Sequence, residues 1–224
     1  MQNKLAPADC ALCPRLSVFR QDNQLKFPHF FNGAVPSFGA LGARLLIVGL
    51  APGLNGANQT GRPFTGDYAG LILYKGLLDA GFASGHYNPE SYGQDFVYQH
   101  GSNQEDTLKL EDCRITNAVR CVPPENKPET SEIKQCNNFL KAEIQAMPNL
   151  RAILTLGLVS HNAVLRALGY KASHAKFGHG VVHVLGSYTM FNSYHCSRYN
   201  INTNRLSQDM FNEVLHTIRV YLAS

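Results

Sequence analysis

The sequence predicts an α/β fold, a three-layer α/β/α sandwich around a central, mainly parallel sheet. Short apolar runs of strand length alternate along the chain with longer stretches of helical period, which is the pattern of strands joined by helical crossovers. The chain has 224 residues, 44% of them hydrophobic, and no internal repeat. That length and composition suit one core-forming domain, so we expect residues 1–224 to form a single domain.

The first half of the chain contains two predicted strands and one helix. The run ARLLIVGL, residues 43–50, reads as a buried strand, and residues 68–82 follow it as an amphipathic helix. Residues 83–111 are polar and glycine-containing, which predicts an irregular excursion over the surface. A second strand is expected at 113–119, and the N-terminus around Cys10 and Cys13, which Pro14 follows, is expected to be a loop.

The second half begins with a helix through SEIKQCNNFLKAEIQAM, capped by Thr130 or Ser131, with Glu132 and Glu143 expected on its surface. A strand is then expected at 151–157, followed by a helix at 158–170 that Gly169 closes. Two further strands are expected at 181–186 and 188–195, and a terminal helix at 205–222.

Charge and hydropathy narrow the class of protein. The formal net charge is +4, from 20 Lys and Arg against 16 Asp and Glu, a mildly basic balance that permits nucleic-acid binding without identifying it. No apolar run approaches the roughly 20 residues that span a bilayer, so no membrane association is expected. The N-terminus lacks the apolar core of a secretory signal. We therefore expect a cytoplasmic protein.

Three polar segments follow predicted strands. A glycine-rich stretch, GLAPGLNGANQTGRPFTGD at 49–67, follows the first strand, Asn117 lies near the end of the second, and His195 ends the last. Ligands of open parallel sheets bind beyond the carboxyl ends of the strands. The three segments are therefore expected to meet at one edge of the sheet.

Four of the six cysteines suggest a metal site. Cys10 and Cys13 form a C-x2-C pair, Cys121 lies in a proline-rich loop, and Cys136 lies in the predicted helix after it. Thiolates from two separated segments suit a tetrahedral zinc or a 4Fe–4S cluster. The alternative is that they are buried thiols acting as small apolar side chains.

The other cysteines and three histidines carry weaker signals. Cys113 lies in a predicted strand, which favours a core position. Cys196 could be a nucleophile, but nothing near it supplies an activation scheme. A metal site at His174, His179 and His183 lacks an acidic partner, so a loop facing solvent or DNA is favoured.

Several motifs, in order, resemble those of the uracil-DNA glycosylase superfamily. They are GLAPG with TGRPFTGD, then ITNAVRCVPP, then HCS with NTNRL. The paired cysteines indicate the iron–sulfur branch. Leu50 stands where family 4 carries a glutamate, which indicates family 5, the type UDGb. The resemblance runs from Cys10 to Leu206. It implies a DNA-repair glycosylase that removes uracil, and a sheet of four strands.

The resemblance also implies a cofactor and partners. Cys10, Cys13, Cys121 and Cys136 would hold a structural 4Fe–4S cluster. The substrate would be double-stranded DNA that contains uracil, with single-stranded DNA and other deaminated bases as further substrates. A monomer is expected.

Residues of the first two motifs are expected to bind the base. Phe64 would stack on a flipped ring, although from the residue alone it could be a core aromatic. Asn117 would match the O4 and N3–H edge of uracil, although an isolated asparagine at a strand end more often satisfies a turn. Backbone amides of Gly49, Ala51 and Gly53 would hold the base edge, since glycine permits close approach.

Two further side chains are expected to act in cleavage together with Asn117. His195 would donate a hydrogen bond to uracil O2 and stabilise the departing anion. Neither Leu50 nor Gly53 can accept a proton, so Asp67 is the nearest carboxylate that could orient the water or stabilise the sugar cation. Asp67 would also serve as a helix N-cap.

The segment after His195 is expected to contact DNA. Ser197, Arg198 and Arg205 would hold phosphates, and Leu206 would wedge into the gap left by the flipped nucleotide. Leu206 could equally begin the core face of the terminal helix. The motif departs from the usual HPS at Cys196, where proline would stiffen the loop.

Two other classes compete with this reading. A non-catalytic iron–sulfur or zinc DNA-binding protein would explain the missing acid and the altered H-C-S motif. A nucleotide-binding enzyme could use the glycine-rich loop for phosphate, but GLAPGLNGA matches neither G-x-x-x-x-G-K-[ST] nor G-x-G-x-x-G.

Overall fold

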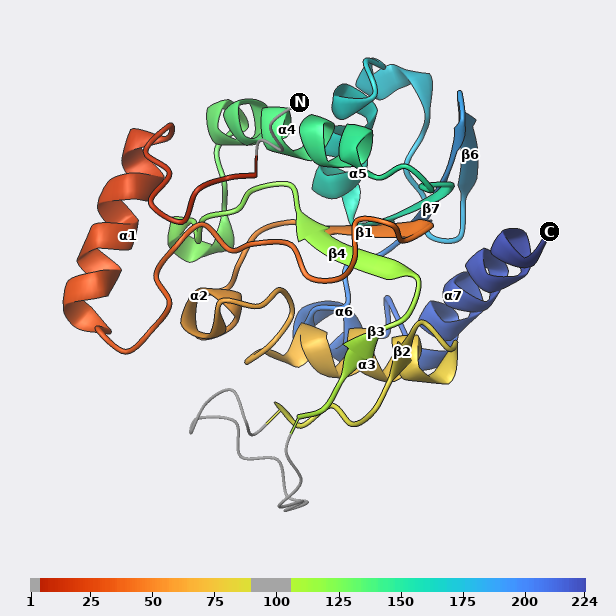
Figure 1. Cartoon of the computed structure of the whole chain (residues 1–224), viewed down its shortest axis with the longest axis horizontal. Coiled ribbons are helices and arrows are strands. Elements are labelled where there is room, and N and C mark those ends of the chain that lie inside the picture. The colour runs from red at the N-terminus through yellow and green to blue at the C-terminus, as the bar shows by residue number, and fades with distance from the viewer. Residues whose placement is uncertain (1–4, 90–105) are drawn as a thin grey trace.

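A five-stranded sheet forms the centre of the computed structural model, which describes residues 5–89 and 106–224 (Figure 1). The strand order is β4-β1-β5-β7-β6. The strands are β1 (Leu45–Gly49), β4 (Cys113–Asn117), β5 (Ala152–Leu156), β6 (Val182–Leu185) and β7 (Tyr188–Ser193). The expected strands are thus confirmed within one or two residues at each end.

The number of strands implied by the resemblance was wrong. Four strands do run parallel, β4, β1, β5 and β7, and β6 adds an antiparallel edge to β7. The short Gly186–Ser187 turn, with Gly186 at φ 61°, joins β6 directly to β7. A connection this short allows only antiparallel pairing.

Helices cover both faces of the sheet, as the α/β/α prediction requires (Figure 1). The helices of the described residues are α1 (Pro14–Lys26), α2 (Ala57–Thr60), α3 (Tyr68–Asp79), α4 (Thr130–Ala146), α5 (Leu158–Ala167), α6 (Arg198–Asn202) and α7 (Gln208–Ala223), with short 3-10 turns η2 (Pro124–Asn126) and η3 (Ala172–His174). Alternate residues of β1 point to opposite faces. Leu45 and Ile47 pack with α3 and α7, and Leu46 and Val48 pack with α4 and α5.

The segment expected to be irregular holds a small second sheet. Strands β2 (Ala83–Ser84) and β3 (Lys109–Leu110) pair antiparallel. Part of the predicted excursion, residues 90–105, lies outside the described residues.

The loop expected around Cys10 and Cys13 is confirmed, and it leads into α1, a helix from Pro14 that the sequence did not predict. Proline suits the first helical position, where its missing N–H has no intrahelical partner. The helix buries only Leu16, Arg20 and Asn23. A mostly polar helix gives no apolar period, so the sequence pattern did not reveal it.

Two expectations about α4 were also wrong. Its N-cap is Glu129, which forms a reciprocal capping box with Glu132. Glu132 and Glu143 are buried rather than exposed. Each carboxylate is paired, Glu132 with Arg15 at 2.8 Å and Glu143 with Arg114 at 2.7 Å and with Arg120.

The predicted terminal helix, 205–222, is confirmed as α7, and a short helix that the sequence did not predict precedes it. The five-residue α6 comes first, and α7 starts after its N-cap Ser207, whose side chain accepts a hydrogen bond from the Met210 amide. No helix in the described ranges combines the length and apolarity that crossing a bilayer requires.

Candidate active site and cysteine pocket

The carboxyl ends of the four parallel strands meet at one site, as the sequence predicted. Gly49 at the end of β1 lies in register with Asn117 at the end of β4. Gly157 follows β5, and a Cβ built on it would lie 3.6 Å from the Cβ of His195, which follows β7. Parallel pairing therefore brings the glycine-rich loop, Asn117 and His195 together.

A pocket opens at this edge of the sheet. It is lined by Leu50, Ala51, Pro52, Gly53, Leu54, Asn55, Gly56, Ala57, Phe64, Gly66, Asp67, Tyr68, Ala69, Asn117, Asn126, His195, Ser197 and Arg198. The lining includes all the expected base-binding residues except Gly49. Gly49 lies next to two of them, Phe64 and Asn117.

Gly49 leaves room for the side chains of Phe64 and Asn117 at the end of β1. A Cβ at Gly49 would stand 2.6 Å from Phe64 Cζ and would also overlap Asn117 Oδ1. Phe64 is buried, adopts a φ of 57°, and faces the His195 ring with a centroid distance of 6.2 Å and an interplanar angle of 30°. Positive φ is rare for an aromatic residue and marks a position held by its surroundings.

Asp67 lies at the rim of the pocket and is the N-cap of α3. Its Oδ1 accepts a hydrogen bond from the Gly70 amide at 3.1 Å, which confirms the capping role. Its Oδ2 points toward the glycine-rich loop, 2.7 Å from where a Cβ on Gly56 would be. Desolvation by burial raises the pKa of Asp67 to about 6 despite this hydrogen bond.

His195 lines the same pocket as Asp67. Its backbone carbonyl accepts a 2.7 Å hydrogen bond from Asn200 Nδ2, which fixes the loop after β7. Burial lowers the pKa of His195 to about 4, so the ring is neutral at neutral pH. Cys196 beside it is fully buried, and burial raises the pKa of its thiol. A buried protonated thiol is a poor nucleophile.

Two of the four expected DNA-contacting residues, Ser197 and Arg198, line the pocket. Ser197 caps α6 and accepts from the Asn200 amide, and exposed Arg198 lies 5.2 Å from the centre of the Tyr68 ring. Exposed Arg205 lies 4.6 Å from the centre of the Tyr194 ring. Stacking on aromatic faces holds both guanidinium groups while leaving their donors free for solvent or ligand.

Leu206 does not lie at the surface. Its side chain is 1% exposed and belongs to the core cluster beneath α3 and α7. The structure thus supports the core alternative and contradicts the wedge, because a side chain already buried in the core is not available to enter DNA.

Asn126 is a pocket residue that sequence reasoning missed. It is exposed at the pocket mouth, and its Oδ1 lies 4.0 Å from where a Cβ on Gly53 would be. Glu125 and Asn126 have φ values of 55° and 57°. Two consecutive left-handed residues are unusual outside glycine. The only signal in the sequence was an asparagine in a proline-rich loop.

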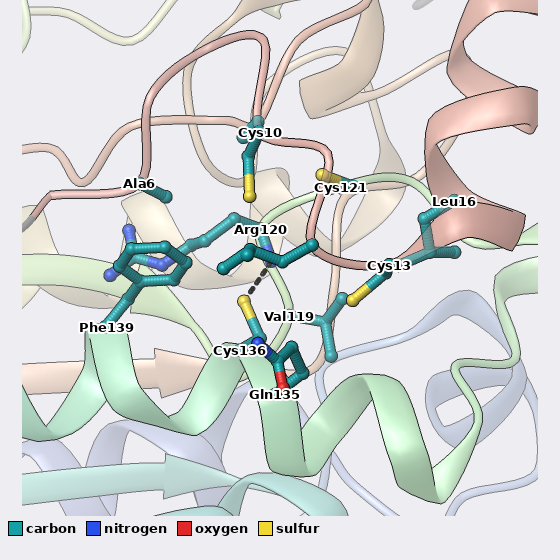
Figure 2. Close-up of a pocket in the computed structure, with 12 residues that line it drawn as sticks. Ala6, Cys10, Cys13, Leu16, Val119, Arg120, Cys121, Gln135, Cys136 and Phe139 are labelled. Atoms are coloured by element: carbon teal, nitrogen blue, oxygen red, sulfur yellow. Dashed lines mark hydrogen bonds between the residues drawn. The ribbon is translucent and has the colours of Figure 1, made fainter.

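The four expected metal-ligand cysteines line a second pocket, near α1 and the start of α4. Figure 2 shows Cys10 and Cys13 from the N-terminal segment and Cys121 and Cys136 around the same space. The Arg120 amide donates to Cys136 Sγ at 3.3 Å. Burial raises the pKa of Cys121 to about 11 and that of Cys136 to about 12.

These cysteines share a pocket without converging on one point. Among residues 5–89 and 106–224, no three His, Cys, Asp or Glu side chains form a group suited to one metal ion. This also applies to the three histidines noted in the sequence. His174 stacks on Tyr170, His179 stacks on Tyr194, and His183 Nε2 lies 3.0 Å from the Lys176 carbonyl.

Comparison with known proteins agrees with this arrangement. Residues 36–219 match the family model of the uracil DNA glycosylase superfamily. A type-5 uracil-DNA glycosylase of Thermus thermophilus is 39% identical over 212 residues, covering 92% of this chain and 90% of that protein. A type-5 enzyme of Pyrobaculum aerophilum is 35% identical over 211 residues, with coverages of 92% and 86%.

A type-4 uracil-DNA glycosylase of Pyrobaculum aerophilum is also similar, at 31% identity over 142 residues, or 63% of this chain and 58% of that protein. The two type-5 matches are longer and more similar than this type-4 match. The chain therefore belongs to the uracil-DNA glycosylase superfamily, and within it to the type 5 family.

Proposed function

We propose that this protein is a DNA-repair glycosylase that hydrolyses the N-glycosidic bond of uracil in DNA and leaves an abasic site. The observation that carries the proposal is the pocket itself, where a buried aromatic ring, an amide, a neutral imidazole and a carboxylate of raised pKa meet. The whole chain acts as one monomeric catalytic domain in the cytoplasm.

The base is bound after leaving the helix. A base inside a duplex is unreachable, so it is flipped out at a cost of a few kcal/mol. Phe64 then offers its ring for stacking, and the Asn117 amide offers a donor to uracil O4 and an acceptor to N3–H. The backbone amides of Gly49, Ala51 and Gly53 approach the base edge.

Cleavage separates charge between the sugar and the base. The C1′–N1 bond breaks, and its electron pair leaves with uracil as an anion. His195 donates one N–H to uracil O2, which a neutral imidazole can do. A water oxygen bonds to C1′, and the water proton passes to the Asp67 carboxylate before it is released to solvent or the base. Asn117 contributes by holding the ring while charge builds on it.

Contacts outside the pocket position the DNA. Ser197, Arg198 and Arg205 hold phosphates beside the flipped nucleotide, with each arginine carried on an aromatic ring. Contacts to phosphates do not depend on which base is present, so the base pocket alone selects the substrate. Double-stranded DNA is the main partner, and unpaired strands present the base without the flipping cost.

The cysteine pocket would hold a 4Fe–4S cluster. Four cysteines line it, their sulfurs surround it without meeting at one ion, and N–H groups donate to two of them. N–H···S hydrogen bonds are a regular feature of cluster sites. When bound, the cluster supplies a structural crosslink between the N-terminal segment, the proline-rich loop and α4.

The non-catalytic alternative is disfavoured by Asp67. A pure DNA-binding protein has no need of a carboxylate whose ionisation is made costly by burial. Asp67 compensates for the missing acid at Leu50 and Gly53.

The test is incubation with duplex DNA that holds one uracil, followed by hot alkali. Strand cleavage at the uracil position is expected, and intact protein-bound DNA would favour the non-catalytic alternative. A panel with hypoxanthine, xanthine and mispaired thymine then defines the substrate range. Iron analysis of the same preparation tests the cofactor, with absorbance expected at roughly 400 nm. A colourless preparation with stoichiometric zinc would contradict the cluster.

A further inference from the structure

Arg20 is a buried cation beside the cysteine pocket. It lies in the middle of α1, is 5% exposed, and its Nη1 donates to Cys121 Sγ at 3.5 Å. None of the ion pairs found within residues 5–89 and 106–224 includes it. A guanidinium group stays ionised in proteins. Its burial therefore calls for a negative charge in the pocket.

Two neighbouring arginines do have carboxylate partners. Arg15, on the same helix, pairs with Glu132 at 2.8 Å. The guanidinium of Arg120 pairs with Glu143, and the hydrogen bond from Arg120 to Cys136 Sγ comes from its backbone N–H. Of these three arginines, Arg20 is the one whose side chain hydrogen-bonds a cysteine sulfur instead of a carboxylate.

Thiolates can supply the missing charge. Thiolate ligands outnumber the positive charges of an iron–sulfur core, so the bound cluster with its cysteines is anionic. A buried ion without a partner is strongly unfavourable, whereas a buried pair with a hydrogen bond is tolerated. The arginine and the anionic cluster would each offset the cost of burying the other.

We propose that Arg20 is a further residue of the cluster site, which neutralises the cluster's charge and hydrogen-bonds the Cys121 ligand. The proposal rests on the cofactor named under the proposed function. The contact spans 101 residues of sequence, from α1 to the proline-rich loop. It therefore also docks α1, whose other buried side chains are only Leu16 and Asn23.

The test compares Arg20→Gln, which keeps an N–H donor without the charge, with Arg20→Lys, which keeps the charge. The matched control is Lys134→Gln on α4. That lysine is two residues from Cys136 but exposed, so solvent screens its charge. For each full-length protein, iron content is measured, and loss of visible absorbance is followed after adding a ferrous-iron chelator.

Outer-shell partners of metal ligands typically change metal affinity by about 10–100-fold. We expect Arg20→Gln to lose iron at least about tenfold faster than wild type. Arg20→Lys should lie between the two, and Lys134→Gln should match wild type. The midpoint potential of Arg20→Gln should also fall, since reduction adds negative charge; each tenfold destabilisation of the reduced form corresponds to about 59 mV.

Wild-type rates of iron loss in Arg20→Gln, or equal deficits in Arg20→Lys and Arg20→Gln, would overturn the proposal. If Arg20→Gln does not fold, Arg20→Lys still decides: it should retain iron, and an iron-free but folded Arg20→Lys would contradict charge compensation. Wild-type protein without iron would instead refute the cluster itself, and this proposal with it.

Discussion

The two carboxylate oxygens of Asp67 face different segments of the chain. Oδ1 accepts a hydrogen bond from the Gly70 amide in α3, and Oδ2 lies beside Gly56, where an added Cβ would be only 2.7 Å from it. The first contact caps α3, and the second brings the other oxygen to the pocket. One side chain therefore has both the structural role and the site position that the sequence suggested. Desolvation of the carboxyl group by burial raises its pKa to about 6.

The raised pKa of Asp67 predicts the pH dependence of excision. If the carboxylate must be ionised, activity is lost as pH falls through about 6, whereas His195 stays neutral down to about pH 4. Single-turnover rates at pH 5 should be roughly a tenth of those at pH 8. DNA binding measured over the same range serves as the control. A flat rate profile from pH 5 to pH 8 would exclude a required Asp67 carboxylate.

A methyl group at Gly49 should disturb the base pocket. In Gly49→Ala the new Cβ would overlap Asn117 and stand 2.6 Å from Phe64 Cζ. Overpacking of this kind costs about 1–3 kcal/mol of unfolding free energy, and misplaced site residues should slow excision at least about tenfold. Gly42→Ala is the control, since the nearest atom to its Cβ would be 3.9 Å away. Equal behaviour of the two variants would mean that the pocket relaxes freely.

Glu143 should be important for stability. Glu143 is 1% exposed and its carboxylate pairs with both Arg114 and Arg120, so Glu143→Gln leaves two buried guanidinium groups without an anion. Removing one partner of a buried ion pair costs about 3–5 kcal/mol. Urea unfolding measures the loss. Asp79→Asn breaks the exposed pair with Lys75 and keeps an amide oxygen for the exposed hydrogen bond from Asn212 Nδ2, so it should cost no more than about 0.5 kcal/mol.

Substitution of Leu206 distinguishes a role in the hydrophobic core from a role in DNA binding. Because its side chain lies in the core, Leu206→Ala should lose about 2–5 kcal/mol of unfolding free energy. The affinity of the folded protein for uracil-containing DNA should stay within about threefold, less than one kcal/mol. Leu25→Ala, at an 85% exposed position of α1, should leave stability nearly unchanged. A stable Leu206→Ala protein with much weaker DNA binding would restore the wedge.

The sheet and its active edge could be predicted from the sequence because both follow from local patterns. Buried strands are continuous apolar runs, and parallel connections place their carboxyl ends on one side. The positions of Gly49, Asn117 and His195 follow from these two rules. Asp67 was predictable as a cap because capping depends on residues three positions apart.

Other features depend on contacts that no local pattern encodes. Glu143 looked like a surface residue of α4, because its partners Arg114 and Arg120 come from another segment. The buried Arg20 side chain donates a hydrogen bond to the sulfur of Cys121, which lies 101 residues away in the sequence. Asn126 reaches the pocket through two left-handed residues in a proline-rich loop. The fifth strand, β6, was expected from the apolar run at 181–186, whereas the family resemblance implied only four strands.

The most direct test of the proposed chemistry is single-turnover excision of uracil from duplex DNA by Asp67→Asn beside wild type, with DNA affinity measured on the same substrate. Asparagine keeps the capping oxygen but cannot take a proton, so the rate should fall about 10²–10⁴-fold. The dissociation constant should stay within about threefold. Excision by Asp67→Asn at the wild-type rate would contradict the account and remove Asp67 from the mechanism.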